Sequence, residues 1–305
     1  NLDKYNTGNH ISNYFSGTLL LNNNEYSESY NFLKKLDGLE EDHINYSSKY
    51  LFSLINLGKF NEAFNYSQKL ERKKLSNFES NLIMGIYYLK KEKHDLAQEY
   101  FLKLRNRGSK SVLNNFVSNS LFNWLSFKDL QLTSAQKKID LINPRFSNLK
   151  KIQNIFLHCF YQSEETELLF KNLVSIKEID FSRYNYFYAI YLVDSNRVEQ
   201  AKRLINTSLK SYPRNLLLNQ YKRNLDGGRH ENNFNCQNLS HVIAEILYIT
   251  ANALSSQDVY KISNFYLNLS KYLNKDFNSF DTLLAENFYK IENFSKAKEI
   301  YNQIG

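Results

Sequence analysis

The residues of this chain that could do chemistry are scattered, and none of them completes a motif with a known mechanism. Ser134 and Lys137 have the spacing of a serine nucleophile and its lysine base, but the motifs that accompany such a pair are absent. His241 and Glu245 lie four positions apart and would share one helix face, yet two ligands do not make a metal site. The sequence therefore predicts no catalytic residue, no metal and no cofactor.

The two cysteines, Cys159 and Cys236, lie far apart in the chain. Their separation is typical neither of a disulfide framework nor of metal-ligand spacing. His158 precedes Cys159, but on a helix the two side chains would point about 100° apart and could not act together. We expect Cys159 to lie in the core. The cysteines leave the compartment open between cytoplasm and periplasm.

Basic side chains are in excess, with a formal net charge of +8, and two groups of them follow successive predicted helices. Lys73 and Lys74 follow the first of these helices, and Arg105 and Arg107 follow the second. Such an edge could attract phosphate, so a nucleic-acid or regulatory binder is an alternative function. Cations also gather at helix C-termini because the carbonyl ends favour them, which explains the edge without nucleic acid.

Composition limits the elements that could position any site. Hydrophobic residues make up 42% of the chain and aromatic residues 15%, so it can bury a core and is not disordered. Only 9 glycines and 2 prolines occur, too few for the frequent turns of an all-β fold. The longest nearly uninterrupted apolar run, 186–193, is far shorter than the about 20 residues of a membrane-spanning helix. The sequence predicts long helices and no membrane span.

A repeat of about three dozen residues runs along the chain. Its anchors are compact residues, preceded three places earlier by a bulky residue and followed four places later by another, which is the spacing of one helix face. The anchors are Ser29, Ala63, Ala97, Ala135, Thr166, Ala201, Ser263 and Ala297. The period predicts one helical hairpin for each anchor.

A second compact slot lies twelve places before many of the anchors, as at Gly17 and Gly85. Eight of the ten alanines occupy the two slots, so the pattern is not accidental. Where two helices of a hairpin cross closely, a small residue lets the backbones approach. The turn between the helices is expected five places before the anchor, at Asn24, Gly58 or Asn196, because these residue types tolerate positive φ.

This pattern resembles the tetratricopeptide repeat (TPR), a hairpin of two helices with small residues at the crossing points and aromatic residues between them. The resemblance covers about residues 9–304, and the order of motifs is also similar to a group of alphaproteobacterial TPR proteins that brings no activity with it. It implies an all-α, right-handed superhelical solenoid of about eight antiparallel hairpins.

Three segments are expected within one continuous solenoid. Residues 9–213 would form six hairpins, and residues 239–305 two more. Between them, 214–238 holds more chain than one period, with a helix expected over 215–225 and a Gly- and Asn-rich loop over 226–233.

The resemblance places the first helix of each hairpin on a concave inner wall, where apolar side chains would be exposed to a partner. The residues expected to bind are Tyr14, Leu21, Phe52, Ile55, Leu82, Ile86, Leu89, Trp124, Phe127, Tyr186 and Ile190. We therefore expect a non-enzymatic scaffold for protein–protein interaction that binds a peptide or an amphipathic helix and has no small-molecule substrate. Tight winding or a further N-terminal segment could instead bury this wall, and the chain could also be the repeat portion of a longer enzyme.

Overall fold

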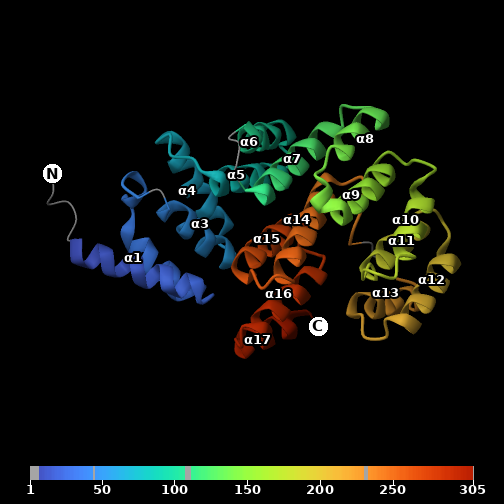
Figure 1. The fold of residues 1–305 in the computed structure, drawn as a ribbon. Coiled ribbons are helices and arrows are strands. Elements are labelled where there is room, and N and C mark those ends of the chain that lie inside the picture. The colour runs from blue at the N-terminus through green and yellow to red at the C-terminus, as the bar shows by residue number, and fades with distance from the viewer. Residues whose placement is uncertain (1–6, 44, 107–110, 230–232, 305) are drawn as a thin grey trace. The chain divides into compact units, whose positions relative to one another are not determined.

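The computed structural model describes residues 7–43, 45–106, 111–229 and 233–304. Within these residues the chain forms seventeen α-helices and no strand (Figure 1), so the predicted all-α fold class is confirmed. The extra helix expected over 215–225 is present as α13, Leu216–Asp226. Of the loop expected after it, residues 230–232 lie outside the described part of the chain.

Residue contacts divide the chain into two compact units, and the first is built from both ends of the sequence. Unit 1 takes in the described residues up to Ser126 and from Ile243 onward, and unit 2 those from Phe127 to Val242. This division cuts across the boundaries 9–213, 214–238 and 239–305 expected for one continuous array. It falls inside two helices, α7 Val112–Phe127 and α14 Leu239–Ser255.

The helices have the following bounds. The other helices of unit 1 are α1 Thr7–Asn22, α2 Tyr26–Leu33, α3 Tyr46–Asn56, α4 Phe60–Arg72, α5 Phe78–Lys90, α6 His94–Asn106, α15 Tyr260–Leu273, α16 Ser279–Lys290 and α17 Phe294–Ile304. Unit 2 contains, besides α13, helices α8 Leu132–Asp140, α9 Ser147–Phe160, α10 Thr166–Val174, α11 Arg183–Asp194 and α12 Val198–Ser211. Consecutive helices such as α1 and α2, α5 and α6, and α11 and α12 pack against each other as hairpins.

The turns of the hairpins follow the predicted register. Five places before the anchor, φ is positive in six of the described hairpins, at Asn24, Gly58, Glu92, Asn196, Asp258 and Glu292. The next N–H then reaches back to a carbonyl of the preceding helix, as from Lys59 to Leu54 at 2.9 Å, which satisfies an end of that helix. Asn24, Gly58 and Asn196 were predicted from their residue types. Asp258 is also of a type that tolerates positive φ, whereas Glu92 and Glu292 show that the hairpin imposes this conformation even on side chains that do not favour it.

The compact slots lie where the helices of a hairpin approach each other. In the first hairpin, the Ser29 hydroxyl donates to the Gly17 carbonyl at 2.8 Å. In the third, a Cβ added to Gly85 would lie 2.3 Å from the Phe101 ring, so only glycine fits without movement. The eight slot alanines expose at most 2% of their surface: Ala63, Ala97, Ala135, Ala189, Ala201, Ala251, Ala285 and Ala297. The contacts of Ser29 with Gly17 and of Gly85 with Phe101 agree with the steric reason inferred for the repeat, and the slot alanines are buried as that reason requires.

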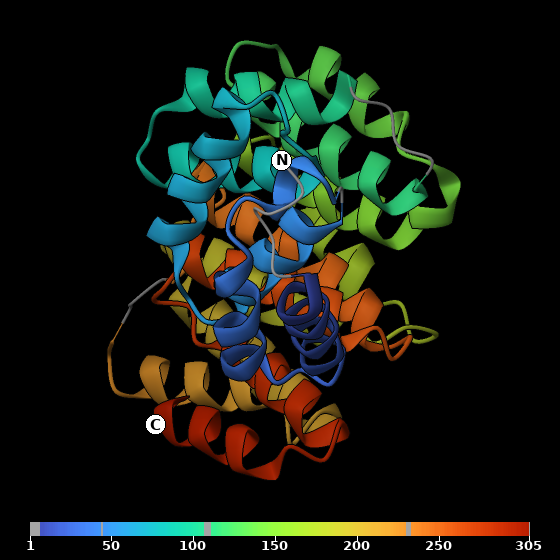
Figure 2. The same ribbon diagram turned by 90° about the vertical axis from the view of Figure 1, so that its left-hand side faces the viewer.

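The core of unit 1 joins helices that are distant in the sequence. Helix α15 packs against α3 and α5, which precede it by well over a hundred residues (Figures 1 and 2). The two ends of unit 1 therefore share one hydrophobic core, and the chain leaves this core and returns to it.

Candidate functional site

The apolar side chains expected on a concave wall are mostly buried. Tyr14 and Phe52 are half-buried, and the other nine expose 3% or less of their surface. These nine are Leu21, Ile55, Leu82, Ile86, Leu89, Trp124, Phe127, Tyr186 and Ile190. The expectation that they form a solvated wall is therefore wrong, because other parts of the chain cover them.

In unit 1, the chain's own helix α15 covers the face of α3 that the sequence assigned to a partner. The ring of Phe265 stacks on that of Phe52, with centroids 4.3 Å apart. Lys90 at the end of α5 donates to the carbonyl of Leu273, the last residue of α15, at 2.9 Å. The Asn268 amide also donates to the Asn56 side chain at 3.1 Å. Unit 1 thus supplies its own helix where a bound helix was expected.

A buried polar network fixes α15 between the first and last hairpins. The Asn287 amide donates to Asn264 Oδ1 at 2.8 Å and to Ser263 Oγ at 2.9 Å. The Asn264 amide donates to the Tyr26 hydroxyl at 3.0 Å, and this hydroxyl donates to Asn24 at 2.8 Å. Burial raises the pKa of Tyr26, so its proton stays in place for that bond. Because buried amides without partners are costly, the network favours one placement of α15.

The predicted basic edge is partly neutralised by acidic neighbours. Lys73 Nζ lies 3.0 Å from the Glu40 carboxylate and also pairs with Glu41. Lys74, the next residue, is exposed and has a positive φ at the end of its helix. Lys73 therefore has an intramolecular role that the sequence did not reveal.

The second basic group is only partly described. The Arg105 guanidinium lies 4.9 Å from the centroid of the Phe122 ring, a cation–π contact with the following helix. Arg107 lies outside the described residues. Of the four basic residues of this edge, Lys73 and Arg105 thus make contacts within the chain, and these contacts account for their positions without a bound nucleic acid.

The buried carboxylate of Glu40 is expected to make the free energy of unfolding depend on pH. Burial alone would raise the pKa of Glu40, but hydrogen bonds from Lys69, Lys73 and the Gly38 N–H outweigh it and hold the pKa at about 2. Since an unfolded glutamate titrates near pH 4.3, this stabilisation is present above about pH 4.3 and lost as the pH falls toward 2. Glu40→Gln should lower the free energy of unfolding by about 2–3 kcal/mol at pH 7 and by less toward pH 2.

The matched control is Glu41→Gln, because the Glu41 side chain is 59% exposed although it also pairs with Lys73. Its effect should stay within about 0.5 kcal/mol at every pH. Chemical unfolding curves recorded across this pH range measure both variants. If the difference in free energy of unfolding between Glu40→Gln and the wild type does not change with pH, the stabilisation does not come from the ionised Glu40 carboxylate.

The histidines singled out in the sequence have structural partners. The ring of His158 is buried, with Nδ1 3.1 Å from Ser163 Oγ and Nε2 3.3 Å from Gln136 Oε1. His241 Nδ1 accepts a hydrogen bond from the Asn235 N–H at 3.1 Å. Among the residues that the structure describes, no three His, Cys, Asp or Glu side chains are grouped to hold a metal ion.

Cys159 and Cys236 form a disulfide, which corrects the sequence interpretation. Their Cα atoms are 5.9 Å apart although 77 positions separate them in the chain. Cys159 lies near the end of α9 with 9% of its surface exposed, so its predicted place in the core is confirmed. Cys236 belongs to the segment 233–238 that precedes α14. The even number of cysteines was the one available signal, and it is too weak to predict pairing by itself.

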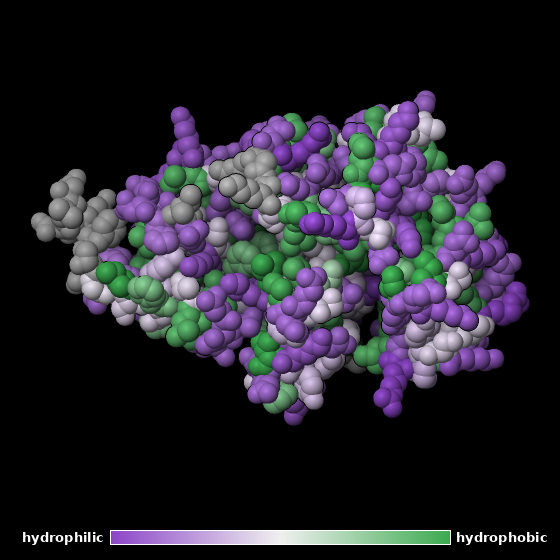
Figure 3. All heavy atoms as spheres, viewed as in Figure 1, coloured by the Kyte–Doolittle hydropathy of each residue, from purple (hydrophilic) through white to green (hydrophobic). Residues whose placement is uncertain are grey.

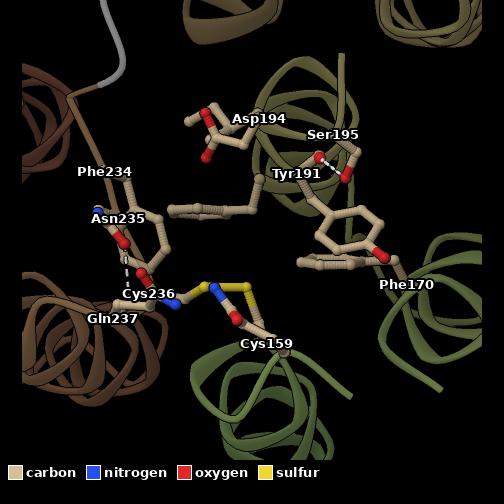
Figure 4. Close-up of a pocket in the computed structure, with 12 residues that line it drawn as sticks. Cys159, Phe170, Tyr191, Asp194, Ser195, Phe234, Asn235, Cys236 and Gln237 are labelled. Carbon is tan, nitrogen blue, oxygen red and sulfur yellow. Dashed lines mark hydrogen bonds between the residues drawn. A yellow bond between two sulfur atoms is a disulfide. The ribbon is translucent and has the colours of Figure 1, made fainter. Parts of the chain in front are cut away.

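Beside this disulfide, unit 2 contains a pocket of about 510 Å³ (Figure 4). Helices α9, α10 and α11 and the segment 234–237 form its walls. Its lining residues are Cys159, Gln162, Phe170, Phe187, Ile190, Tyr191, Asp194, Ser195, Phe234, Asn235, Cys236 and Gln237. Of the residues that the sequence assigned to a binding face, Ile190 is among them, whereas Tyr186 packs edge-on against Tyr221 at 4.8 Å.

The pocket is lined by aromatic rings on one part of its wall and by an acidic side chain on another. Phe187 and Phe234 are buried and lie edge to face, with ring centroids 4.6 Å apart, and Phe170 lies 5.9 Å from Tyr191. In the view of Figure 4 the rings lie between the disulfide and Asp194, the last residue of α11. The pocket therefore has an apolar floor and an acidic group at one side. Sequence reasoning missed it because its walls come from four separate segments.

A stripe of exposed apolar residues also runs along α1. Ile11, Phe15 and Leu19 follow one another at intervals of four and are 57%, 66% and 62% exposed. Figure 3 shows hydrophobic atoms over this helix, at the left of the view. The apolar surface of the first hairpin is thus displayed on this face of α1, while Leu21 is buried.

None of the helices in the described part of the chain combines the length and the apolar character needed to cross a bilayer. No protein-family model matches the chain, and no curated protein is significantly similar to it.

Proposed function

We propose that this chain is a TPR-like helical-repeat scaffold without catalytic activity, which binds a short peptide segment of a protein partner in the pocket of unit 2. The observation that carries the proposal is this pocket, where four aromatic rings and a disulfide adjoin the amides of Gln162 and Gln237. Aromatic walls with a few polar groups are typical of ligand sites, and amides can bond the backbone of an extended peptide. The positions of the hairpin turns and compact residues support the proposal that the chain is a member of the TPR family with a superhelical arrangement of its hairpins.

An extended peptide fits this surface better than an amphipathic helix. A volume of about 510 Å³ holds a few side chains, whereas a helix presents an apolar face several turns long. In unit 1 the face of α3 that would receive such a helix is covered by α15. Of the two ligands expected from the sequence, the peptide is therefore the one we propose.

The disulfide favours one of the two compartments. Cystine bridges persist in oxidising surroundings such as the bacterial periplasm and are rare in the reducing cytosol. The bridge between Cys159 and Cys236 joins the walls of the proposed site, so an oxidising compartment keeps this site in the form described. We place the working scaffold in the periplasm.

A substitution that fills the pocket tests the function without removing core contacts. Ser195 lines the pocket, is exposed, and bonds through its hydroxyl only to the Tyr191 carbonyl one turn earlier among the contacts described. Peptides are selected from a displayed random library on the full-length wild-type chain and then measured on purified variants. Ser195→Trp should weaken their binding by about tenfold or more, because its indole occupies the space of the ligand side chain.

The matched control is Ser256→Trp. Ser256 is also exposed, follows the end of α14 and bonds back to the Ala253 carbonyl at 2.9 Å, but it does not line the pocket. Its peptide affinity should equal that of the wild type. If the library yields no binding peptide, or if Ser195→Trp binds the selected peptides as well as Ser256→Trp does, the pocket is not the binding site.

A further inference from the structure

Two lysines from distant parts of unit 1 reach the same helix, α1, and bind there to neutral side chains. Lys49 of α3 donates from Nζ to the Tyr14 hydroxyl at 2.8 Å, and this Nζ lies 4.7 Å from the centroid of the Tyr14 ring. Lys261 of α15 donates from Nζ to Asn22 Oδ1 at 2.9 Å. Neither lysine forms an ion pair within the described part of the chain. These two residues are called the lysine pair below.

The charges of the lysine pair are close enough to act on each other. Burial lowers the pKa of Lys261, and the positive charge of Lys49 lowers it further. Tyr14 and both lysines are half-buried and Asn22 is exposed, so solvent reaches the pair from one side. An anion that enters from there is attracted by both ammonium groups and offsets the repulsion between them.

Two buried polar atoms beside Tyr14 have no hydrogen-bond partner among the described residues. One is the Thr18 hydroxyl oxygen, and Thr18 lies one helical turn from both Tyr14 and Asn22, on the face of α1 that the lysine pair contacts. The other is Nδ1 of His43, whose ring centroid lies 4.5 Å from that of Tyr14. Because buried polar atoms in native proteins nearly always have a partner, two such atoms at one place indicate a polar ligand.

We propose that the lysine pair binds a phosphate dianion, either free phosphate or a phosphate monoester. Two ammonium groups balance the charge of about −1.5 to −2 that a phosphate monoester carries at neutral pH. The Tyr14 hydroxyl accepts from Lys49 and therefore keeps its own proton to donate to a phosphate oxygen, and the Thr18 hydroxyl is a second donor. A carboxylate carries only one negative charge and would leave one lysine uncompensated. The site belongs to unit 1 and does not depend on the function proposed for the pocket of unit 2.

The carboxylates around the lysine pair bond to other groups. Asp258 accepts a hydrogen bond from the Tyr260 hydroxyl, and Glu79 accepts one from the Ser48 hydroxyl at 2.8 Å. Asp42 is exposed, so solvent and salt screen its charge. None of these three carboxylates pairs with either lysine, and both positive charges remain available to a ligand.

The test measures anion binding to the full-length chain by isothermal titration calorimetry at constant ionic strength. The probes are inorganic phosphate and a glycine–serine peptide with one phosphoserine, and acetate is the control with a single charge. Inorganic phosphate or the phosphoserine peptide should bind about tenfold or more tightly than acetate. The tighter of the two probes shows whether the site takes the free ion or a phosphorylated chain. Acetate binding as tight as that of both phosphate probes would overturn the choice of a dianion.

Substitutions of the two lysines then assign the binding to this site. Lys49→Gln and Lys261→Gln should each reduce phosphate affinity by about tenfold, because each removes one of the two charges. The matched control is Lys298→Gln, since Lys298 is exposed on α17 of the same unit and its loss changes the net charge equally. Its phosphate affinity should equal that of the wild type. The proposal is overturned if the wild type binds no phosphate, or if neither substitution in the lysine pair weakens binding more than Lys298→Gln does.

Thermal unfolding separates loss of the site from loss of the fold. Because a bound ligand stabilises the folded state, phosphate should raise the Tm of the wild type and of Lys298→Gln but not that of Lys49→Gln or Lys261→Gln. All four proteins should unfold cooperatively in buffer without phosphate. Peptide binding by the pocket of unit 2 should be the same in all four, so this inference can fail while the proposed function stands.

Discussion

Replacing Phe265 with alanine is expected to lower the free energy of unfolding of unit 1 by about 3–5 kcal/mol. Phe265 is 1% exposed and stacks on Phe52, at the point where α15 covers α3. The substitution removes a ring from a packed interior and leaves a cavity between two ends of the sequence. Urea unfolding of the full chain measures the loss, and hydrogen exchange read by mass spectrometry locates it in peptides from α3, α5 and α15.

Phe294→Ala is the control for this prediction. Phe294 lies in the same unit, on α17, but is 55% exposed, so its removal should change stability by no more than about 0.5 kcal/mol. Exchange in the peptides of unit 2 should stay unchanged in both variants. An effect of Phe265→Ala as small as that of Phe294→Ala would mean that α15 does not close the face of α3.

Breaking the disulfide is expected to have the second large effect, here on unit 2. The bridge closes a loop between residues 77 positions apart, and the chain-entropy relation gives about 4.5 kcal/mol for a loop of this length. Dithiothreitol should therefore lower the free energy of unfolding of the wild type by about 2–4 kcal/mol, as measured by urea unfolding. The variant with Cys159→Ser and Cys236→Ser should show the same loss without reductant.

Adding reductant to the double serine variant controls for effects other than disulfide reduction. Its unfolding curve should not move when dithiothreitol is added. If the wild type is equally stable with and without reductant, the bridge does not hold the segment 233–238 against α9. Since Cys159 and Cys236 both line the pocket, loss of peptide affinity on reduction would link this bridge to binding as well.

The sequence by itself determined the local architecture. Compact residues such as Ala63 and Ala97 recur where two helices of a hairpin cross, and both are fully buried. The turn register is equally local, because a positive φ five places before the anchor ends one helix and starts the next. These features depend on residues less than one repeat apart, so side-chain size and backbone preference suffice to predict them.

The tertiary structure alone decided which surfaces stay open. Phe52 and Ile55 have the spacing of an exposed inner wall, but α15 returns from more than two hundred positions away to cover Phe52, and Ile55 is buried. Periodicity shows which face of a helix is apolar, but not whether another helix or a partner covers it.

The pocket and its disulfide were decided in the same way. Cys236 reaches Cys159 across 77 positions, and Asp194, Phe170 and Phe234 line one pocket only because α10, α11 and the segment 234–237 converge. Such meetings depend on how distant segments pack, and the sequence pattern of each segment carries no information about its distant neighbours. The repeat could thus be predicted from local sterics, whereas the candidate site arises from long-range packing.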